Sequence, residues 1–240
     1  SGNWSGKTAA VLAFQPAAVQ VSATDFAALP GLEKTIFQIT KANIDTPFCY
    51  TGRSDIEVLS ETAAERNKYF TIGCFTPYML WEDEVLIAWQ ELFAMNFDLK
   101  MQFFSECFSD PEMVKKAALR LAKIGYPIEK ILFSTCPAEP LSIFTNLDLV
   151  LAVSKEWPVL LCHALYMGVP VVALSSIREQ EQHVQKILQS AGLKELVVEN
   201  IEAQVEKASA ILKDEKFLTV LHQNLRNIIL RSPLMDGEEY

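Results

Sequence analysis

The stretch at residues 145–175 constrains the fold more than any other part of this sequence. An apolar run at 149–153 precedes a segment with apolar residues at helical spacing, 157–167, and a second apolar, β-branched run follows at 169–174. Between the helical segment and the second run stands Gly168, where a helix commonly ends in the left-handed conformation. This order predicts a buried strand, helix and strand.

From residue 69 onward the sequence repeats this alternation of strand and helix. Further strands are predicted at 69–75, 99–104, 131–135 and 195–198, and further helices at 82–95, 110–125, 178–191, 201–212 and 216–231. Such alternation favours an α/β fold with a parallel sheet and helices on both faces, a Rossmann-like lobe. Its ligands are expected at the carboxyl ends of the strands, in the loops after Phe75, Thr135 and Val153.

The first sixty residues differ from the rest of the chain. They predict a short helix and three strands, at 7–14, 19–22, 35–40 and 55–59. The segment that follows, 61–67, is charged and lacks bulky apolar residues, so it is the best linker in the sequence. We therefore expect residues 1–66 to be the end and linker of a first α/β lobe, and residues 67–240 to be a Rossmann-like second lobe.

The charge of the chain excludes some partners. A net charge of −9 and a pI near 4.9 argue against nucleic acid, because its binders need clustered Lys and Arg to neutralise phosphates. Residues 157–174 carry no formal charge for a length that could suggest a membrane span. Pro158, His163, Gly168 and Pro170 interrupt this stretch, so we interpret it as protein core and expect no membrane span.

The cysteines are typical of a cytoplasmic protein. The cysteines are odd in number and lack a C-x-x-C pair, which favours reduced core thiols over disulfides or a metal site; they are Cys49, Cys74, Cys107, Cys136 and Cys162. The chain begins without Met or a signal peptide, so we expect a fragment or trimmed chain. Residues 5–8, Ser-Gly-Lys-Thr, resemble the end of a phosphate-binding loop but lack its earlier glycine.

Three histidines are available for acid–base chemistry: His163, His183 and His222. None has a partner at metal-ligand spacing, so no metal is expected. Only His163 falls near the expected cleft, where it is either a packed or a solvent-facing helix residue.

The loop before the 157–167 helix is the position at which an α/β protein of this kind would hold phosphates, because unpaired N–H groups and the helix dipole converge there. Residues 155–160 read Lys-Glu-Trp-Pro-Val-Leu, without a glycine or a hydroxyl group and with one carboxylate. The sequence therefore predicts a nucleotide-type site that lacks phosphate-binding groups.

Several segments resemble the carboxyl-terminal half of O-linked N-acetylglucosamine transferases and their SPINDLY-type relatives. They are 13–20 (AFQPAAVQ), 70–75, 169–172 (VPVV), 191–200 (AGLKELVVEN) and 231–240 (RSPLMDGEEY). The resemblance implies a GT-B glycosyltransferase fold with two Rossmann-like lobes. It also implies metal-independent, inverting transfer of a sugar from a UDP-sugar, held mainly by the second lobe, to a protein Ser or Thr.

This sequence departs from the family at the positions that the resemblance assigns to the nucleotide-sugar cleft. Active members place Gly-His-Thr-Thr at the start of the helix, where this chain has Trp157, Pro158, Val159 and Leu160. Where the family has an acidic residue three positions further on, this chain has His163.

Two other parts of the implied cleft depart as well. After Thr76, the family's Gln and Lys fall on Pro77 and Leu80. The family's Ala-Pro-Lys turn falls on Pro137, Ala138 and Glu139, which replaces a cation with an anion. Two arginines of the front segment correspond to Thr8 and Gln15.

We therefore hypothesise a non-catalytic or accessory member of this family whose cleft has lost the UDP-sugar and binds a protein partner, such as an active glycosyltransferase. One alternative is an active glycosyltransferase that uses other contacts or another donor, with a protein Ser or Thr as acceptor. Another is a different GT-B activity such as a sugar-nucleotide epimerase, which would need a carboxylate or histidine pair that the cleft does not display. No cofactor is expected, apart from a UDP-sugar donor if the protein is active.

Overall fold

The computed structural model describes residues 14, 21–22, 37–38, 50–53, 55–95, 98–136, 140–153, 158–176 and 182–236. Several predictions lie outside these residues. They are the helix at 7–14 apart from Phe14, the Ser-Gly-Lys-Thr segment at 5–8, and the site positions Thr8, Gln15, Pro137, Ala138, Glu139 and Trp157.

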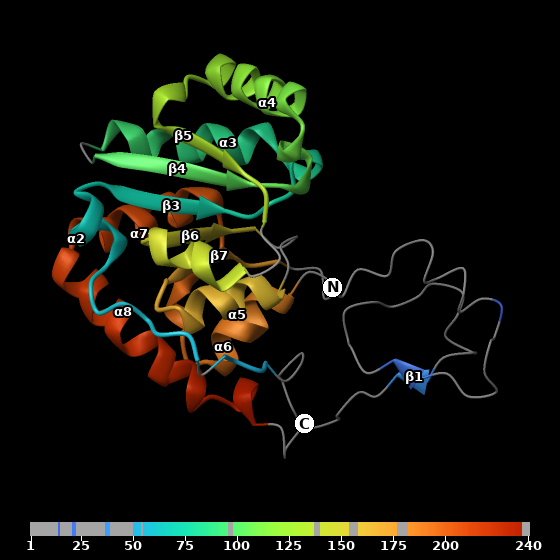
Figure 1. Cartoon of the computed structure of the whole chain (residues 1–240), viewed down its shortest axis with the longest axis vertical. Helices are drawn as coiled ribbons and strands as arrows, with labels where there is room; N and C mark the ends of the chain where they lie inside the picture. Colours follow the sequence, from blue (N-terminus) through green and yellow to red (C-terminus); the bar gives the residue numbers. More distant parts are fainter. Residues whose placement is uncertain are drawn as a thin grey trace.

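A six-stranded parallel sheet forms the centre of the molecule (Figure 1). In spatial order its strands are β5 (Ile131–Ser134), β4 (Leu99–Phe104), β3 (Phe70–Cys74), β6 (Leu149–Ala152), β7 (Val171–Leu174) and β8 (Val197–Val198). The central pair is in register at Ile72 and Leu149. The predicted α/β fold with a parallel sheet is therefore confirmed. A separate parallel pair joins β1 (Val21–Ser22) to β2 (Phe37–Gln38).

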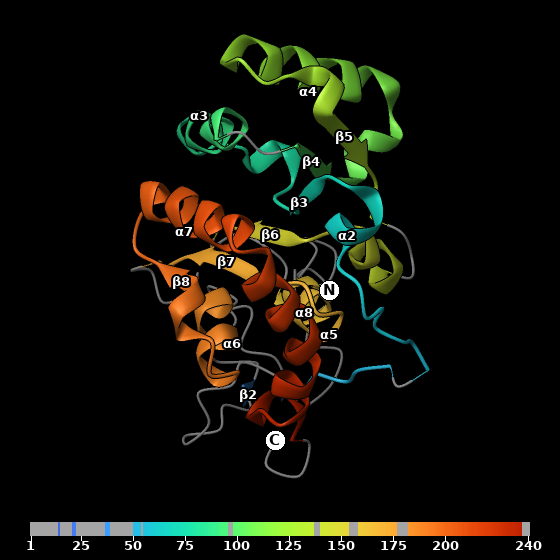
Figure 2. The same cartoon turned by 90° about the vertical axis from the view of Figure 1, so that its left-hand side faces the viewer.

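Helices cover both faces of this sheet (Figures 1 and 2). Right-handed crossovers place α3 (Asp83–Gln90) and α4 (Pro111–Ile124) on one face, where α7 (Ile201–Lys213) contacts α3. They place α5 (Pro158–Tyr166) and α6 (His183–Ser190) on the other face, and α8 (Glu215–Leu230) contacts both α7 and α5. Short 3₁₀ turns connect these elements: η1 (Tyr78–Leu80), η2 (Glu91–Ala94), η3 (Glu106–Ser109), η4 (Ile128–Lys130), η5 (Pro140–Asn146), η7 (Lys194–Leu196) and η8 (Pro233–Met235).

The ends of these helices follow local sequence signals. Helix α4 begins where the Asp110 side chain accepts a hydrogen bond from the Glu112 N–H at 2.9 Å, with Pro111 in the first position. After α5, Gly168 has φ +80°, and a Cβ there would lie 2.5 Å from the carbonyl oxygen of His222. Only glycine fits this turn without strain, as the sequence predicted.

Residues 61–67, which the sequence predicted as a linker without regular structure, contain the short helix α2 (Ala63–Asn67). A capping box forms between Thr62 and Glu65: the hydroxyl accepts from the Glu65 N–H at 3.2 Å, and the carboxylate from the Thr62 N–H at 2.7 Å. The 55–59 segment, predicted as a strand, runs without strand pairing in the structure.

A buried polar side chain joins helices α3 and α7 to the sheet. Gln204 of α7 is fully buried, and its Oε1 accepts a hydrogen bond from Nε1 of Trp89 in α3 at 2.8 Å. Its Nε2 donates to the carbonyl oxygens of Ala152 and Val172, each at 2.9 Å. The side chain thus satisfies groups of one helix and two strands. Among the described residues, no helix has the length and apolar character needed to cross a membrane.

Candidate functional site

The carboxyl ends of the parallel strands define the candidate site. The arrows of β3 and β4 in Figure 1 point to this edge of the sheet, which we call the carboxyl edge. Here β3 leads into η1, β4 into η3 and β6 toward α5. Because β3 and β6 are hydrogen-bonded neighbours, the segments at 76–80 and 158–160 start from the same point of the sheet.

The segment after β3 is held by its own backbone and presents apolar side chains. Thr76 is buried, and its carbonyl oxygen accepts a hydrogen bond from Nε1 of Trp81 at 3.0 Å. The Pro77 carbonyl oxygen accepts the Leu80 N–H at 2.8 Å, which closes η1. Met79 and Leu80 remain 81% and 41% exposed. This turn therefore offers solvent two apolar side chains.

The start of α5 has the same character. Pro158 has no N–H, so one of the donors that a helix usually presents at its start is missing. Val159 is 39% exposed and Leu160 is almost buried. No side chain of this first turn can donate a hydrogen bond to a phosphate oxygen.

Negative charge gathers at the carboxyl edge. Burial, and then the nearby carboxylate of Glu106, raise the pKa of the Cys136 thiol, which follows β5. Asp83 and Glu84 lie in the first turn of α3, and Glu112 in the first turn of α4. The charge of Asp83 is offset by an ion pair with Arg120 at 2.6 Å. The other two carboxylates stabilise their helix termini and would repel a polyphosphate.

His163 is engaged within the chain. Its Nδ1 lies 2.7 Å from the hydroxyl oxygen of Tyr50, and the two rings meet edge-on at 5.4 Å between centroids. Burial lowers the pKa of His163 and raises the pKa of Tyr50, so the neutral imidazole accepts a hydrogen bond from the phenol. His163 is therefore a packed helix histidine, and its position does not free Nδ1 for acid–base chemistry.

The other histidines lie elsewhere. His183 starts α6, and His222 of α8 is buried with Nδ1 3.0 Å from the Gly168 carbonyl oxygen and Nε2 2.7 Å from that of Leu59. Within the described part of the chain, no group of His, Cys, Asp and Glu is arranged to hold a metal ion. The described cysteines, Cys74, Cys107, Cys136 and Cys162, are free thiols.

The structure thus places Thr76, Pro77 and Leu80 at the same sheet edge as the 158–160 turn. Sequence reasoning missed Tyr50, which lies 113 residues from His163 in the chain. No local pattern could reveal that contact, because it depends on how the segment before α2 returns to α5.

Comparisons with known proteins identify similar chains. A curated protein from Petunia hybrida, a probable UDP-N-acetylglucosamine–peptide N-acetylglucosaminyltransferase SPINDLY, is 22% identical over 261 aligned residues. Its counterpart from Arabidopsis thaliana is 21% identical over 264 residues. Both alignments cover the whole of this chain but only 28% and 29% of those relatives. No family model matches the chain.

Solved structures show the same architecture. A mutant O-GlcNAc transferase from Thermobaculum terrenum superposes with a TM-score of 0.67 and 20% identity, over 91% of this chain and 41% of that one. Anabaena Alr3699/HepE, solved in complex with UDP-glucose, gives a TM-score of 0.59 and 14% identity, over 95% of this chain and 64% of that one. At such identities the likeness establishes the fold, and the expected GT-B-type architecture is confirmed.

Proposed function

We propose that this chain is a non-catalytic or accessory protein related to O-GlcNAc transferases, in which the former nucleotide edge contacts a protein and does not hold a UDP-sugar. The observation that carries this proposal is the composition of the carboxyl edge. Pro158, Val159 and Leu160 begin α5 without a donor side chain, and Leu80 is exposed in the turn that follows the neighbouring strand β3.

The donors missing from this edge would supply much of the binding free energy of a nucleotide complex. Each charge-assisted hydrogen bond contributes about 1.5 to 3 kcal/mol, so losing three or four removes about 4.5 to 12 kcal/mol. A micromolar complex has only about 8 kcal/mol of binding free energy in total. The negative charge of Glu106, felt by Cys136 at this edge, weakens anion binding further.

The exposed apolar groups support a protein as the partner. Met79 is 81% exposed, and Leu80 and Val159 expose about two fifths of their surface. Methionine adapts well to apolar contacts, so these side chains suit a protein surface as partner. An active glycosyltransferase is one partner of this kind. The proposal also divides the chain into the end of a first lobe at 1–66 and a second lobe at 67–240, and places the protein in the cytoplasm.

One observation favours the alternative of an active glycosyltransferase. All six strands and the helix after β6 are in place, and Anabaena Alr3699/HepE shows that the same fold binds UDP-glucose. In this alternative the donor sugar is held by backbone N–H groups at the start of α5 and by residues outside the described chain.

Titration calorimetry with UDP and UDP-N-acetylglucosamine separates the two. The accessory function predicts no binding at submillimolar concentration. A dissociation constant below about 1 mM would favour the enzyme. A buffer titration and a nucleotide-binding relative serve as the negative and positive controls.

A further inference from the structure

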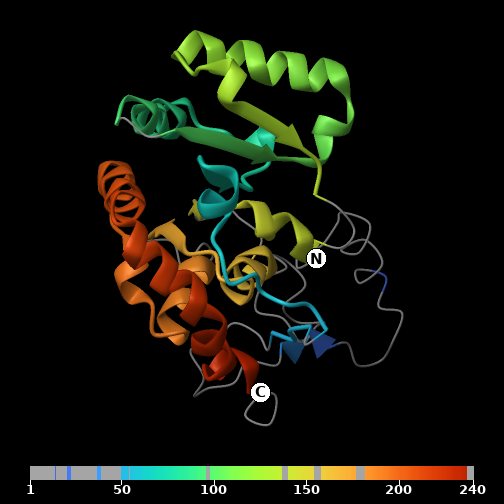
Figure 3. The same cartoon turned by 60° about the vertical axis from the view of Figure 1, so that its left-hand side comes forward.

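A cavity opens at the amino-terminal edge of the sheet, opposite the carboxyl edge. Its volume is about 490 Å³, within the range of small-ligand sites. Helix α2, the segments that lead into β3 and β4, and the first turns of α8 surround it. Figure 3 shows α2, the short cyan helix, beside the red α8, and the Thr219 hydroxyl of α8 lies 3.4 Å from a carboxylate oxygen of Glu65 in α2. We call this space the amino-edge cavity.

Carboxylates from three separate elements line the amino-edge cavity. Glu65 belongs to α2, Asp98 precedes β4, and Glu215 lies in the first turn of α8. Among the described residues that line the cavity, Lys68 carries the positive charge, so three negative charges face one positive charge. Asp98 also pairs with Lys130 at 3.5 Å, an exposed contact that contributes little. The fold therefore concentrates negative charge in a concave site.

Apolar side chains line the same cavity. Ala64 of α2, Phe70 of β3 and Leu218 of α8 are among its walls, and Leu218 is only 2% exposed. A ligand in this space would therefore meet hydrocarbon as well as carboxylate oxygens. Long aliphatic cations suit such surroundings, because their methylene groups pack on apolar surface while the charged ends reach polar groups.

The donors beside the amino-edge cavity are engaged within the chain. The N–H of Ala64, in the first turn of α2, donates to the buried carboxylate of Asp148 at 2.7 Å. Nζ of Lys68 donates to the Glu65 carbonyl oxygen at 2.8 Å. Carboxylate oxygens, in contrast, can each accept more than one hydrogen bond. The cavity thus offers acceptors to a ligand, which favours a cation over an anion.

We propose that the amino-edge cavity binds an aliphatic ammonium ligand, supplied by a free polyamine or by the lysine side chains of a protein. Its ammonium groups donate to the carboxylates of Glu65, Asp98 and Glu215, and its methylene groups pack on Leu218. Separate charges joined by hydrocarbon match separate carboxylates beside apolar side chains. The inference goes beyond the proposed function, because this cavity lies at the opposite edge of the sheet from the start of α5.

Titration of the full chain with spermidine, followed by calorimetry and by ¹H–¹⁵N NMR, tests this proposal. We expect a dissociation constant at or below about 1 mM, which rises with ionic strength. The NMR shifts should be concentrated at residues 64–70, 98 and 215–219. Glu215→Gln should weaken binding about three- to fivefold, the effect of losing one exposed ion pair, and Asp98→Asn by a similar factor. The NMR spectra of the variants also report whether they fold.

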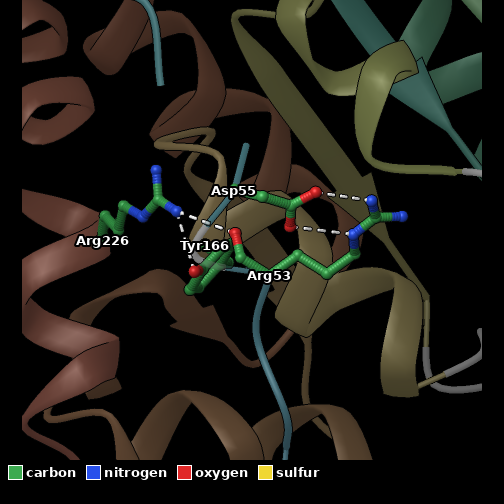
Figure 4. A network of polar contacts seen from close by, with 4 residues as sticks. All are labelled: Arg53, Asp55, Tyr166 and Arg226. Atoms are coloured by element: carbon green, nitrogen blue, oxygen red, sulfur yellow. Dashed lines mark hydrogen bonds and ion pairs between the residues drawn. The ribbon is translucent and has the colours of Figure 1, made fainter. Parts of the chain in front are cut away.

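Asp55→Asn is the matched control, because it removes one exposed carboxylate outside the cavity. Figure 4 shows Asp55 paired with Arg53, at 2.7 Å, beside the contact between Arg226 and Tyr166. Gln223→Ala, at an exposed site further along α8, changes no charge. Both variants should bind spermidine as the natural chain does.

A capped Lys-Gly-Lys peptide distinguishes the two sources of the ammonium groups. Tighter binding of the peptide than of spermidine assigns the cavity to a partner protein, and the reverse order assigns it to a free polyamine. The proposal is overturned if neither probe binds at millimolar concentration, if the shifts lie outside the cavity, or if Asp55→Asn weakens binding as much as Glu215→Gln. UDP binding at the start of α5 would instead contradict the proposed function and leave this inference standing.

Discussion

Replacing Asp148 with asparagine tests how a buried carboxylate is held at the amino-terminal edge of the sheet. Asp148 precedes β6 and is only 3% exposed. One carboxylate oxygen accepts the Ala64 N–H at 2.7 Å, and the other accepts the Thr71 N–H at 2.8 Å. The side chain therefore joins the start of α2 to β3 and β6.

Two opposing effects act on this carboxyl group. Burial raises its pKa, and the N–H donors of Thr71 and Ala64 and the charge of Arg66 lower it. Burial is the larger effect, so the pKa of Asp148 rises from 3.8 to about 6. A change of that size corresponds to about 3 kcal/mol between the two protonation states.

The direction of the pH dependence follows from the number of protons that the folded and unfolded chains bind. Below about pH 4, Asp148 is protonated in both states, so it adds no pH dependence. Between about pH 4 and pH 6 the unfolded chain releases this proton while the folded chain keeps it. The free energy of unfolding therefore falls by up to about 1.4 kcal/mol per pH unit, and by about 3 kcal/mol in total. Above about pH 6 the contribution of Asp148 is constant.

Urea unfolding followed by tryptophan fluorescence measures this directly, because Trp89 is buried. The difference in unfolding free energy between the natural chain and Asp148→Asn cancels most other titrations. Between about pH 4 and pH 7 the natural chain should lose about 3 kcal/mol relative to the variant. A constant difference would show that the pKa of Asp148 is the same in the folded and unfolded chains, and a difference of opposite sign would show that the N–H donors outweigh burial. Either result would contradict the prediction.

Two further substitutions test the packing that positions the carboxyl edge. Gln204→Ala should lower the free energy of unfolding by about 3 kcal/mol or more, because it leaves the Trp89 N–H and two strand carbonyls without partners. A loss below about 1 kcal/mol in urea unfolding, with Gln223→Ala as control, would contradict this. Gly168→Ala should cost about 2 kcal/mol or more, since alanine at φ +80° would bring its Cβ 2.5 Å from the His222 carbonyl. A melting temperature equal to that of the natural chain would argue against the tight turn.

Where the fold depends on local signals, the sequence was sufficient to predict it. The Asp110–Pro111 start of α4 and the Gly168 stop after α5 were predicted and are confirmed, because each is decided by backbone geometry within a few residues. Helix α2 was missed although Thr62 and Glu65 form a capping box that the sequence displays. Its segment is too short and too polar for periodicity to reveal, and its stability depends on the distant Asp148.

For the candidate site, too, the sequence could predict one part and not another. The edge at which Leu80, Val159 and Leu160 lie follows from strand order, so the sequence alone could predict it. The hydrogen bond between Tyr50 and His163 could not be predicted, because the segment at 50–53 becomes a neighbour of α5 only in the folded chain, where α8 packs against α5. Long-range contacts of single residues leave no periodic signal.

A crystal structure determined with millimolar UDP would show directly whether the start of α5 holds a nucleotide. We expect no UDP density beside Pro158, Val159 and Leu160, with Tyr50 still bound to His163. An ordered pyrophosphate held by the backbone N–H groups of Val159 and Leu160 would contradict it.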